Sequence, residues 1–135
     1  MERLVTSEGV QITVRARKHW TSDPLMLEGG EYEFRAEGCW DDMGIPSGPG
    51  GYDTPWWSPL QRLMVQLGWR RVPAAKWFAL CGAVRRSGRP DHKFVIGIES
   101  RHELPAGHLY CFANDVLFFY WNNFGHVNLT VRRVR

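Results

Sequence analysis

The chain has 135 residues, of which 44% are hydrophobic and 23% are charged. This composition excludes an intrinsically disordered chain and suits a single domain that spans residues 1–135. Lys and Arg total 17 against 14 Asp and Glu, which gives a net charge of +3. The basic residues occur in scattered pairs such as Arg70 and Arg71, which we expect on the solvated faces of strands. This distribution argues against nucleic-acid binding, because that function needs a concentrated basic surface.

Targeting and redox signals are weak. The first residues lack a basic segment followed by an apolar run, and no apolar run is long enough to span a membrane. We therefore expect a cytoplasmic protein, or one exported without a classical signal peptide. The 3 cysteines, Cys39, Cys81 and Cys111, are widely spaced and form no C-x-x-C pair, so they are expected to be small buried hydrophobes rather than a disulfide framework.

Alternation of apolar and polar residues predicts most of the elements, in chain order. Each predicted strand has one buried face, and a turn is expected at residues 28–31. The residues on the buried faces are Val10, Ile12, Val14 and Ala16, then Tyr32, Phe34 and Ala36, then Phe94, Ile96 and Ile98, and finally Val127, Leu129 and Val131.

The middle of the chain is different. Gly and Pro between residues 43 and 55 predict a long surface loop without regular structure. Residues 59–68 predict a short helix, with Ser58 as its N-cap. Its apolar face would consist of Leu60, Leu63, Met64 and Leu67. Residues 77–84 fit either a buried strand or a second short helix.

Several amphipathic strands with one short helix must cover their apolar faces with each other. We therefore predict an all-β fold, a small β-sandwich with one short helix, with a barrel of the same strands as the alternative.

Chemistry concentrates between the last two predicted strands. A hairpin needs only two to five residues to turn, whereas the segment here is longer and carries oxygen-bearing side chains, namely Asn114, Asp115, Asn122 and Asn123. Hard cations such as calcium take carboxylate, amide and backbone oxygens of this kind. The alternative is ordinary turn chemistry, since Asn and Asp also cap strand ends and tolerate left-handed backbone.

The same segment resembles the calcium loop of the bacterial galactophilic lectins of the LecA type. In that family the pattern is Asn-Asp-Val, three residues, Tyr, one residue, Asn-Asn, one residue, Gly. The matching residues are Asn114, Asp115 and Val116, then Tyr120, Asn122, Asn123 and Gly125. The likeness extends to residues 30–40, 94–97 and 107–109, and it implies a small β-sandwich that binds carbohydrate through calcium.

Carried over by position, the resemblance implies a set of metal ligands. These are the side chains of Asp115, Asn122 and Asn123, the backbone carbonyl of Phe119, and a further carbonyl at Asp42 or Asp41. Such a site leaves coordination positions for sugar hydroxyls. One certain anionic ligand implies weak, millimolar to micromolar calcium affinity, and weak single sites favour a homo-oligomer.

The resemblance also implies where the sugar lies. The sugar-binding residues would be Asp115, Val116, Phe119 and Asn122, together with Thr54, Trp57 and Trp121. The family carries His-Pro-Asp-Gln where this chain has Thr-Pro-Trp-Trp, so the sugar is galactose-like or another glycan. Aromatic rings at Trp57 and Trp121 suit the apolar face of a sugar.

No enzymatic constellation is convincing, so we predict a protein without catalytic residues. The 5 histidines are dispersed, which argues against zinc, and nothing positions Asp41, Asp42 or Glu99 against Asp115 as a glycosidase pair. The first alternative is an accessory or protein-interaction sandwich that has lost sugar binding, and the second is a glycan-cleaving enzyme.

Overall fold

The computed structural model describes residues 3–21, 24–42, 45–53, 59–66, 70–72, 75–115, 120 and 123–135. The elements in chain order are β1 (Arg3–Leu4), β2 (Val10–Arg15), β3 (Leu25–Asp42), β4 (Ile45–Ser47), α1 (Pro59–Gln66), β5 (Leu80–Arg85), β6 (His92–Val95), β7 (Glu99–Ala113) and β8 (Asn123–Arg133). The all-β fold with one short helix is thereby confirmed.

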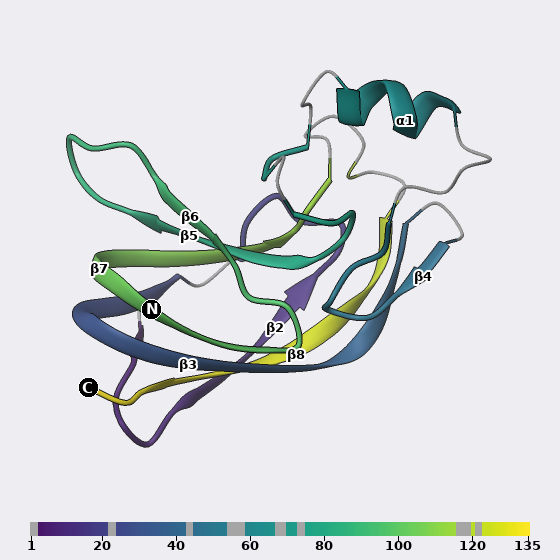
Figure 1. Cartoon of the computed structure of the whole chain (residues 1–135). Coiled ribbons are helices and arrows are strands. Elements are labelled where there is room, and N and C mark those ends of the chain that lie inside the picture. Colours follow the sequence, from purple (N-terminus) through teal and green to yellow (C-terminus); the bar gives the residue numbers. More distant parts are fainter. Residues whose placement is uncertain are drawn as a thin grey trace.

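The strands form one continuous sheet in the order β2-β8-β3-β7-β5-β6, with β1 and β4 also paired to β3. The long strand β3 pairs with β7 along Leu25 to Arg35 and with β8 along Tyr32 to Asp42. The sheet thus folds over on itself, and Figure 1 shows β2, β8 and β3 in one layer with β5, β6 and the end of β7 across from them. Among the described strands β2 and β6 remain unpaired edges, so the result is a sandwich and not a closed barrel.

The main core lies between these layers. The predicted alternation places Ile12 and Val14 of β2, Phe34 of β3, and Leu129 of β8 on one side, and the ring of Phe94 from β6 lies 5.4 Å from that of Phe34. Burying each such side chain stabilises the fold by about 1.5–3 kcal/mol.

A second, smaller core covers the outer side of β5 and β7. It contains Cys81, Ala83 and Phe112, with Trp20 and Val72 packed against them. Strand β5 is therefore buried on both faces. Of residues 77–84, residues 80–84 are therefore buried strand rather than a second helix, and the strand begins at Leu80.

Three local expectations were wrong. Residues 28–31 do not form a turn, because they lie within the continuous strand β3. Gly30 has φ +146 and a Cβ there would lie 2.2 Å from the Arg135 carbonyl oxygen, so glycine permits a close approach of the C-terminus. Ile98 is 61% exposed, since Gly97 with φ 66 redirects the chain after β6. Cys39 is exposed too, whereas Cys81 and Cys111 are buried as expected.

The helix forms within the predicted range, but among the described residues only Met64 of the predicted apolar face is buried. Gln61 and Met64 are 4% and 3% exposed, whereas Leu60 and Leu63 are 54% and 49% exposed. The surface beneath α1 includes polar groups, which a glutamine suits better than a leucine. Ser58 and Leu67 lie outside the described residues.

The expected loop between residues 43 and 55 contains regular structure, because β4 pairs with the end of β3 through Trp40 and Ser47. In Figure 1, α1 lies above this end of the sandwich, and the two termini lie at the other.

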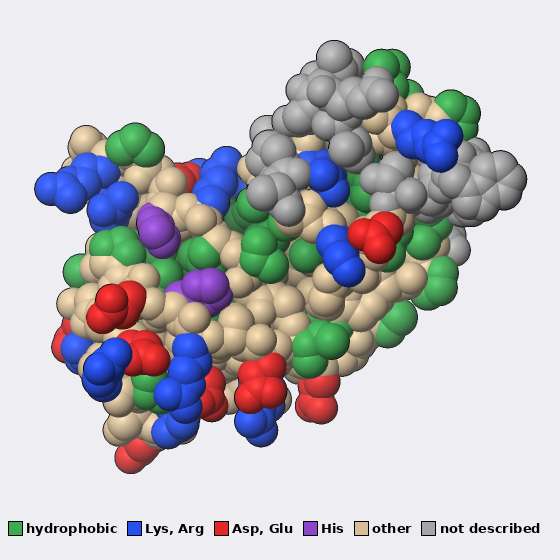
Figure 2. Space-filling model, viewed as in Figure 1, with side chains coloured by type: hydrophobic (Ala, Val, Ile, Leu, Met, Phe, Trp, Pro, Cys, Tyr) green, Lys and Arg blue, Asp and Glu red, His purple; other side chains and the backbone are tan. Residues whose placement is uncertain are grey.

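Charged side chains of both signs are interspersed at the end that carries the termini (Figure 2). Glu33 of β3, for example, pairs with Arg101 at 2.9 Å and with Arg132 at 3.4 Å. Exposed pairs of this kind contribute little to stability. In the described part of the chain, no helix has the length and apolar character needed to cross a membrane.

Candidate functional site

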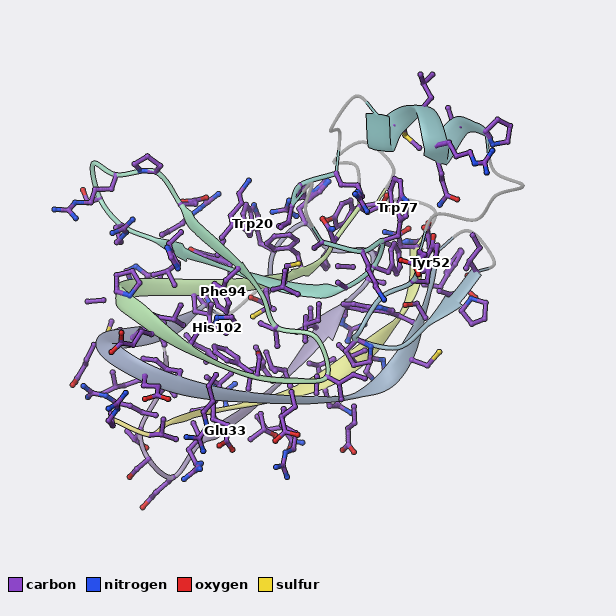
Figure 3. The ribbon with its side chains drawn as sticks, in the orientation of Figure 1. Trp20, Glu33, Tyr52, Trp77, Phe94 and His102 are labelled. Atoms are coloured by element: carbon purple, nitrogen blue, oxygen red, sulfur yellow. The ribbon has the colours of Figure 1, made fainter. Side chains whose placement is uncertain are left out.

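Five polar side chains gather where β3 ends and β8 begins. The antiparallel register places Asp42 opposite Asn123, and the inward alternation of both strands carries these side chains into the end of the core. Asp115, just beyond β7, and Gln61 of α1 are buried beside them. Figure 3 shows Tyr52 at this end of the sandwich, below α1 and near Trp77.

Asp42 is held by two donors. The Tyr52 hydroxyl donates a hydrogen bond to Asp42 Oδ2, and Gln61 Nε2 lies 3.4 Å from the same oxygen and 3.0 Å from the Tyr52 hydroxyl. Burial raises the pKa of Asp42, and the hydrogen bond from Tyr52 opposes that rise.

Tyr52 connects both carboxylates electrostatically. Its pKa is raised first by burial, then by the hydrogen bond and negative charge of Asp42, and also by the charge of Asp115. Asp42 is also the register partner of Asn123, which contacts Asp115, so the five side chains form one cluster.

Asn123 completes the cluster next to Asp115. Its Nδ2 donates to Asp115 Oδ2 at 3.1 Å and to the Ala16 carbonyl at 3.1 Å. Its Oδ1 is buried and accepts no hydrogen bond from the residues that the structure describes, and the same holds for Gln61 Oε1. A buried acceptor without a partner costs about 1–3 kcal/mol, so two in one cluster require an explanation.

The segment that carries Asp115 is anchored by Asn114. Asn114 Oδ1 accepts from the Val72 amide at 2.9 Å, and its Nδ2 donates to the carbonyls of Val72, Ala75 and Lys76 at 3.0, 3.2 and 2.9 Å. This side chain therefore binds the backbone of another segment. It does more than cap the end of its own strand.

Arg71 braces the same segment from the other side. Its Nη1 donates to the Tyr120 hydroxyl at 3.1 Å, and its backbone amide donates to the Asp115 carbonyl at 3.3 Å. Its guanidinium lies 3.7 Å from the centre of the Phe112 ring and 4.1 Å from that of Trp20. Arg71 is only 8% exposed, so its expected place on a solvated strand face was wrong.

The donor set consists of oxygens: two carboxylates, two amide oxygens and a phenol. Such a set suits a hard cation such as calcium. No group of three or more His, Cys, Asp or Glu side chains able to hold a metal ion occurs among the described residues, so amide oxygens have to complete a site here. The two unpartnered amide oxygens fit that requirement.

Of the predicted site residues, the structure brings together the side chains of Asp42, Asp115 and Asn123, although the resemblance implied the backbone carbonyl of Asp42 or Asp41 and not a side chain. Thr54, Trp57, Val116, Phe119, Trp121 and Asn122 lie outside the described residues. Phe124, a further aromatic of this region, is 55% exposed, and the Arg17 guanidinium lies 5.0 Å from its ring centre.

The connection after β7 is not a hairpin loop. Strands β7 and β8 lie on opposite sides of β3, so they are not neighbours and a connection of two to five residues is not expected between them. Part of the length that suggested a ligand loop is therefore explained by topology.

Sequence reasoning missed Tyr52, Gln61 and Arg71. Gln61 lies between Leu60 and Leu63 in the helix, and its burial sets it apart from an ordinary surface glutamine. That burial depends on how the helix packs against the sandwich, which the sequence does not show. Tyr52 and Arg71 had no local pattern that set them apart.

No protein-family model and no curated protein matches this chain. Among solved structures, the chain is similar to the N-terminal domain of EclA, described as a PllA-like lectin. The TM-score is 0.62, the match covers 93% of this chain and 97% of that one, and the sequences are 18% identical. At this identity the likeness shows a common fold.

Proposed function

We propose that this chain is a non-catalytic carbohydrate-binding domain of the lectin kind, which binds sugar hydroxyls through a calcium ion. Two findings support this. The fold is similar to that of a PllA-like lectin domain, and the end of the sandwich holds a buried cluster of oxygen-bearing side chains.

The observation that carries the proposal is the side-chain oxygen of Asn123. Both hydrogen-bonding contacts of its amide nitrogen are used, at 3.1 Å each, while its oxygen is buried without a donor among the described residues. An amide oxygen next to a carboxylate, with no hydrogen to accept, is suited to a cation.

In this proposal Asp115 and Asn123 hold the cation, and Asp42 contributes negative charge from the end of β3. Two buried carboxylates favour a divalent cation more than one does, so the affinity should be higher than a site with Asp115 alone would give. When bound, calcium offers coordination positions that vicinal hydroxyls of a sugar can fill.

The sugar itself stays a prediction from the family resemblance. Phe119 and Asn122 are proposed as further calcium ligands and sugar contacts, with Val116, Thr54, Trp57 and Trp121 lining the sugar. Thr54 and Trp57 occupy the positions at which the LecA-type lectins carry His and Gln. We therefore propose that the bound sugar can be a glycan other than galactose.

Calcium titration calorimetry tests the metal. The wild type should bind calcium with micromolar to millimolar affinity, and Asp115→Asn should lose this binding, because the amide keeps the size of the side chain but removes its charge. Asp91→Asn is the matched control, since Asp91 pairs with Arg85 at 3.4 Å beside the hairpin of β5 and β6. A wild type that takes up no calcium at millimolar concentration refutes the proposal.

A glycan array, read with calcium and with a chelator, tests the sugar. Binding that requires calcium and disappears in Asp115→Asn is the expected result. An array that stays blank while calcium binds would make this a calcium-binding interaction domain without sugar recognition. Release of reducing ends from a bound polysaccharide would contradict the non-catalytic assignment.

A further inference from the structure

Gln61 is the polar residue that α1 buries. It is 4% exposed, although Leu60 and Leu63 of the same short helix are about half exposed. Burying a leucine would stabilise a helix of this kind by about 1.5–3 kcal/mol. The helix instead turns a carboxamide toward the cluster of Asp42 and Tyr52.

The hydrogen bonds of Gln61 fix which atom is which. Its nitrogen lies 3.0 Å from the Tyr52 hydroxyl and 3.4 Å from Asp42 Oδ2. Exchanging nitrogen and oxygen would place the amide oxygen against a carboxylate oxygen, which is repulsive. The nitrogen therefore belongs where it is, and Oε1 is the atom left buried without a donor among the described residues.

Gln61 Oε1 and Asn123 Oδ1 are thus two buried amide oxygens of one cluster that have no hydrogen-bond donor in the described part of the chain. The chain of contacts between them runs from Gln61 through Tyr52 to Asp42, across the strand register to Asn123, which binds Asp115 at 3.1 Å. Each of the two amides contacts a carboxylate of the cluster through its nitrogen, so each buried oxygen belongs to a side chain beside negative charge, where a shared cation would satisfy it.

We infer that Gln61 supplies an additional oxygen ligand to the cation, from outside the loop that carries Asp115. The inference rests on the proposed function and deepens it. Because Gln61 is a buried residue of α1, cation binding and the docking of this helix onto the end of the sandwich are coupled.

Gln61→Met provides the first test. Methionine keeps the length of the side chain and favours helices, but it lacks the amide oxygen. Calcium affinity should fall by about tenfold or more, as on loss of other metal-supporting groups. Gln11→Met is the matched control, because Gln11 is an exposed residue of β2, and it should leave the isotherm unchanged.

Gln61→Glu provides the second test, in which the response to calcium should increase rather than decrease. A carboxylate in place of the amide adds a negative charge beside Asp42, so the melting temperature without calcium should fall. Calcium should restore it, and the calcium-induced rise should exceed that of the wild type. A hydrogen-bonding role toward water or toward Tyr52 alone would not produce this calcium-dependent gain.

The outcomes separate this inference from the proposed function. Wild-type protein that binds no calcium sinks both. Wild-type protein that binds calcium, with an unchanged dissociation constant in Gln61→Met and no larger thermal shift in Gln61→Glu, overturns the role of Gln61 alone. If Gln61→Met does not fold, the thermal shift of Gln61→Glu decides by itself.

Discussion

Tyr120 and Arg71 hold the two ends of the segment that begins with Asp115. The Tyr120 hydroxyl donates to the Ala113 carbonyl and accepts from Arg71, so one oxygen ties residue 120 both to the end of β7 and to a distant arginine. Burial raises the pKa of Tyr120, and the positive charge of Arg71 opposes that rise only in part. The raised pKa keeps the phenol protonated, so that it can donate a hydrogen bond.

Tyr120→Phe should lower the free energy of unfolding by about 1–3 kcal/mol, because the Ala113 carbonyl and the Arg71 guanidinium both lose a buried partner. Urea denaturation measures the change. Tyr110→Phe is the control, since Tyr110 is partly exposed and contacts Trp20 through its ring at 5.4 Å, which phenylalanine preserves. Equal losses in the two variants would contradict the brace. Calcium affinity should also weaken in Tyr120→Phe and stay constant in Tyr110→Phe.

At the scale of elements, an isolated antiparallel β-bridge between Tyr52 and Trp77 fixes the position of the Tyr52 phenol in the candidate site. The Tyr52 amide donates to the Trp77 carbonyl at 2.8 Å, and the Trp77 amide donates to the Tyr52 carbonyl at 3.1 Å. Gly51, directly before Tyr52, has φ +80, and a Cβ there would lie 2.5 Å from the Trp77 oxygen and 2.7 Å from the Ala79 nitrogen.

Gly51→Ala should therefore destabilise the protein by at least about 2 kcal/mol more than Gly88→Ala, because the backbone has to move as well as adopt a strained φ. Gly88 is the matched control, with φ +72 and no described residue beyond its chain neighbours within 4 Å of a Cβ at that position. Thermal unfolding of both variants measures the difference. Equal destabilisation would mean that the close approach at Gly51 relaxes without cost, and that the bridge does not fix Tyr52.

The elements also separate what the sequence predicts from what it cannot. Alternation identified the buried faces of β2, β3 and β8, because a strand with one face in the core leaves that pattern in any chain. It failed at residues 28–31, where two adjacent glycines are typical of a turn but serve a strand that passes close to the C-terminus.

Site residues divide in the same way. Asp115 and Asn123 stand in one short segment with recognisable spacing, so they were predictable. Gln61 and Tyr52 reach the site only through the docking of α1 and the bridge to Trp77, and Arg71 lies 49 positions from Tyr120. Contacts of this separation depend on the topology of the whole sheet, which local patterns do not contain.

At the scale of the whole molecule, two buried thiols link folding to pH. Burial raises the pKa of Cys81 to about 12, and burial together with the nearby Cys81 thiol also raises the pKa of Cys111. Free thiols in an unfolded chain titrate near pH 8.5. Below that pH both the folded and the unfolded protein keep these protons, so the thiols add no pH dependence there.

Above about pH 9 the unfolded chain loses protons that the folded protein retains, so stability must fall as pH rises, by up to about 1.4 kcal/mol per pH unit for each thiol. The loss from Cys81 continues until its folded pKa of about 12. Urea denaturation between about pH 8 and pH 11 measures the slope.

The double variant Cys81→Ala and Cys111→Ala should show a shallower slope, whatever its stability at neutral pH, because fewer groups differ in protonation between the two states. Cys39→Ala is the matched control for the loss of a thiol, because it removes an exposed cysteine. A slope that is the same in all three proteins would show that the two cores of the sandwich admit water to these thiols before the sheet unfolds.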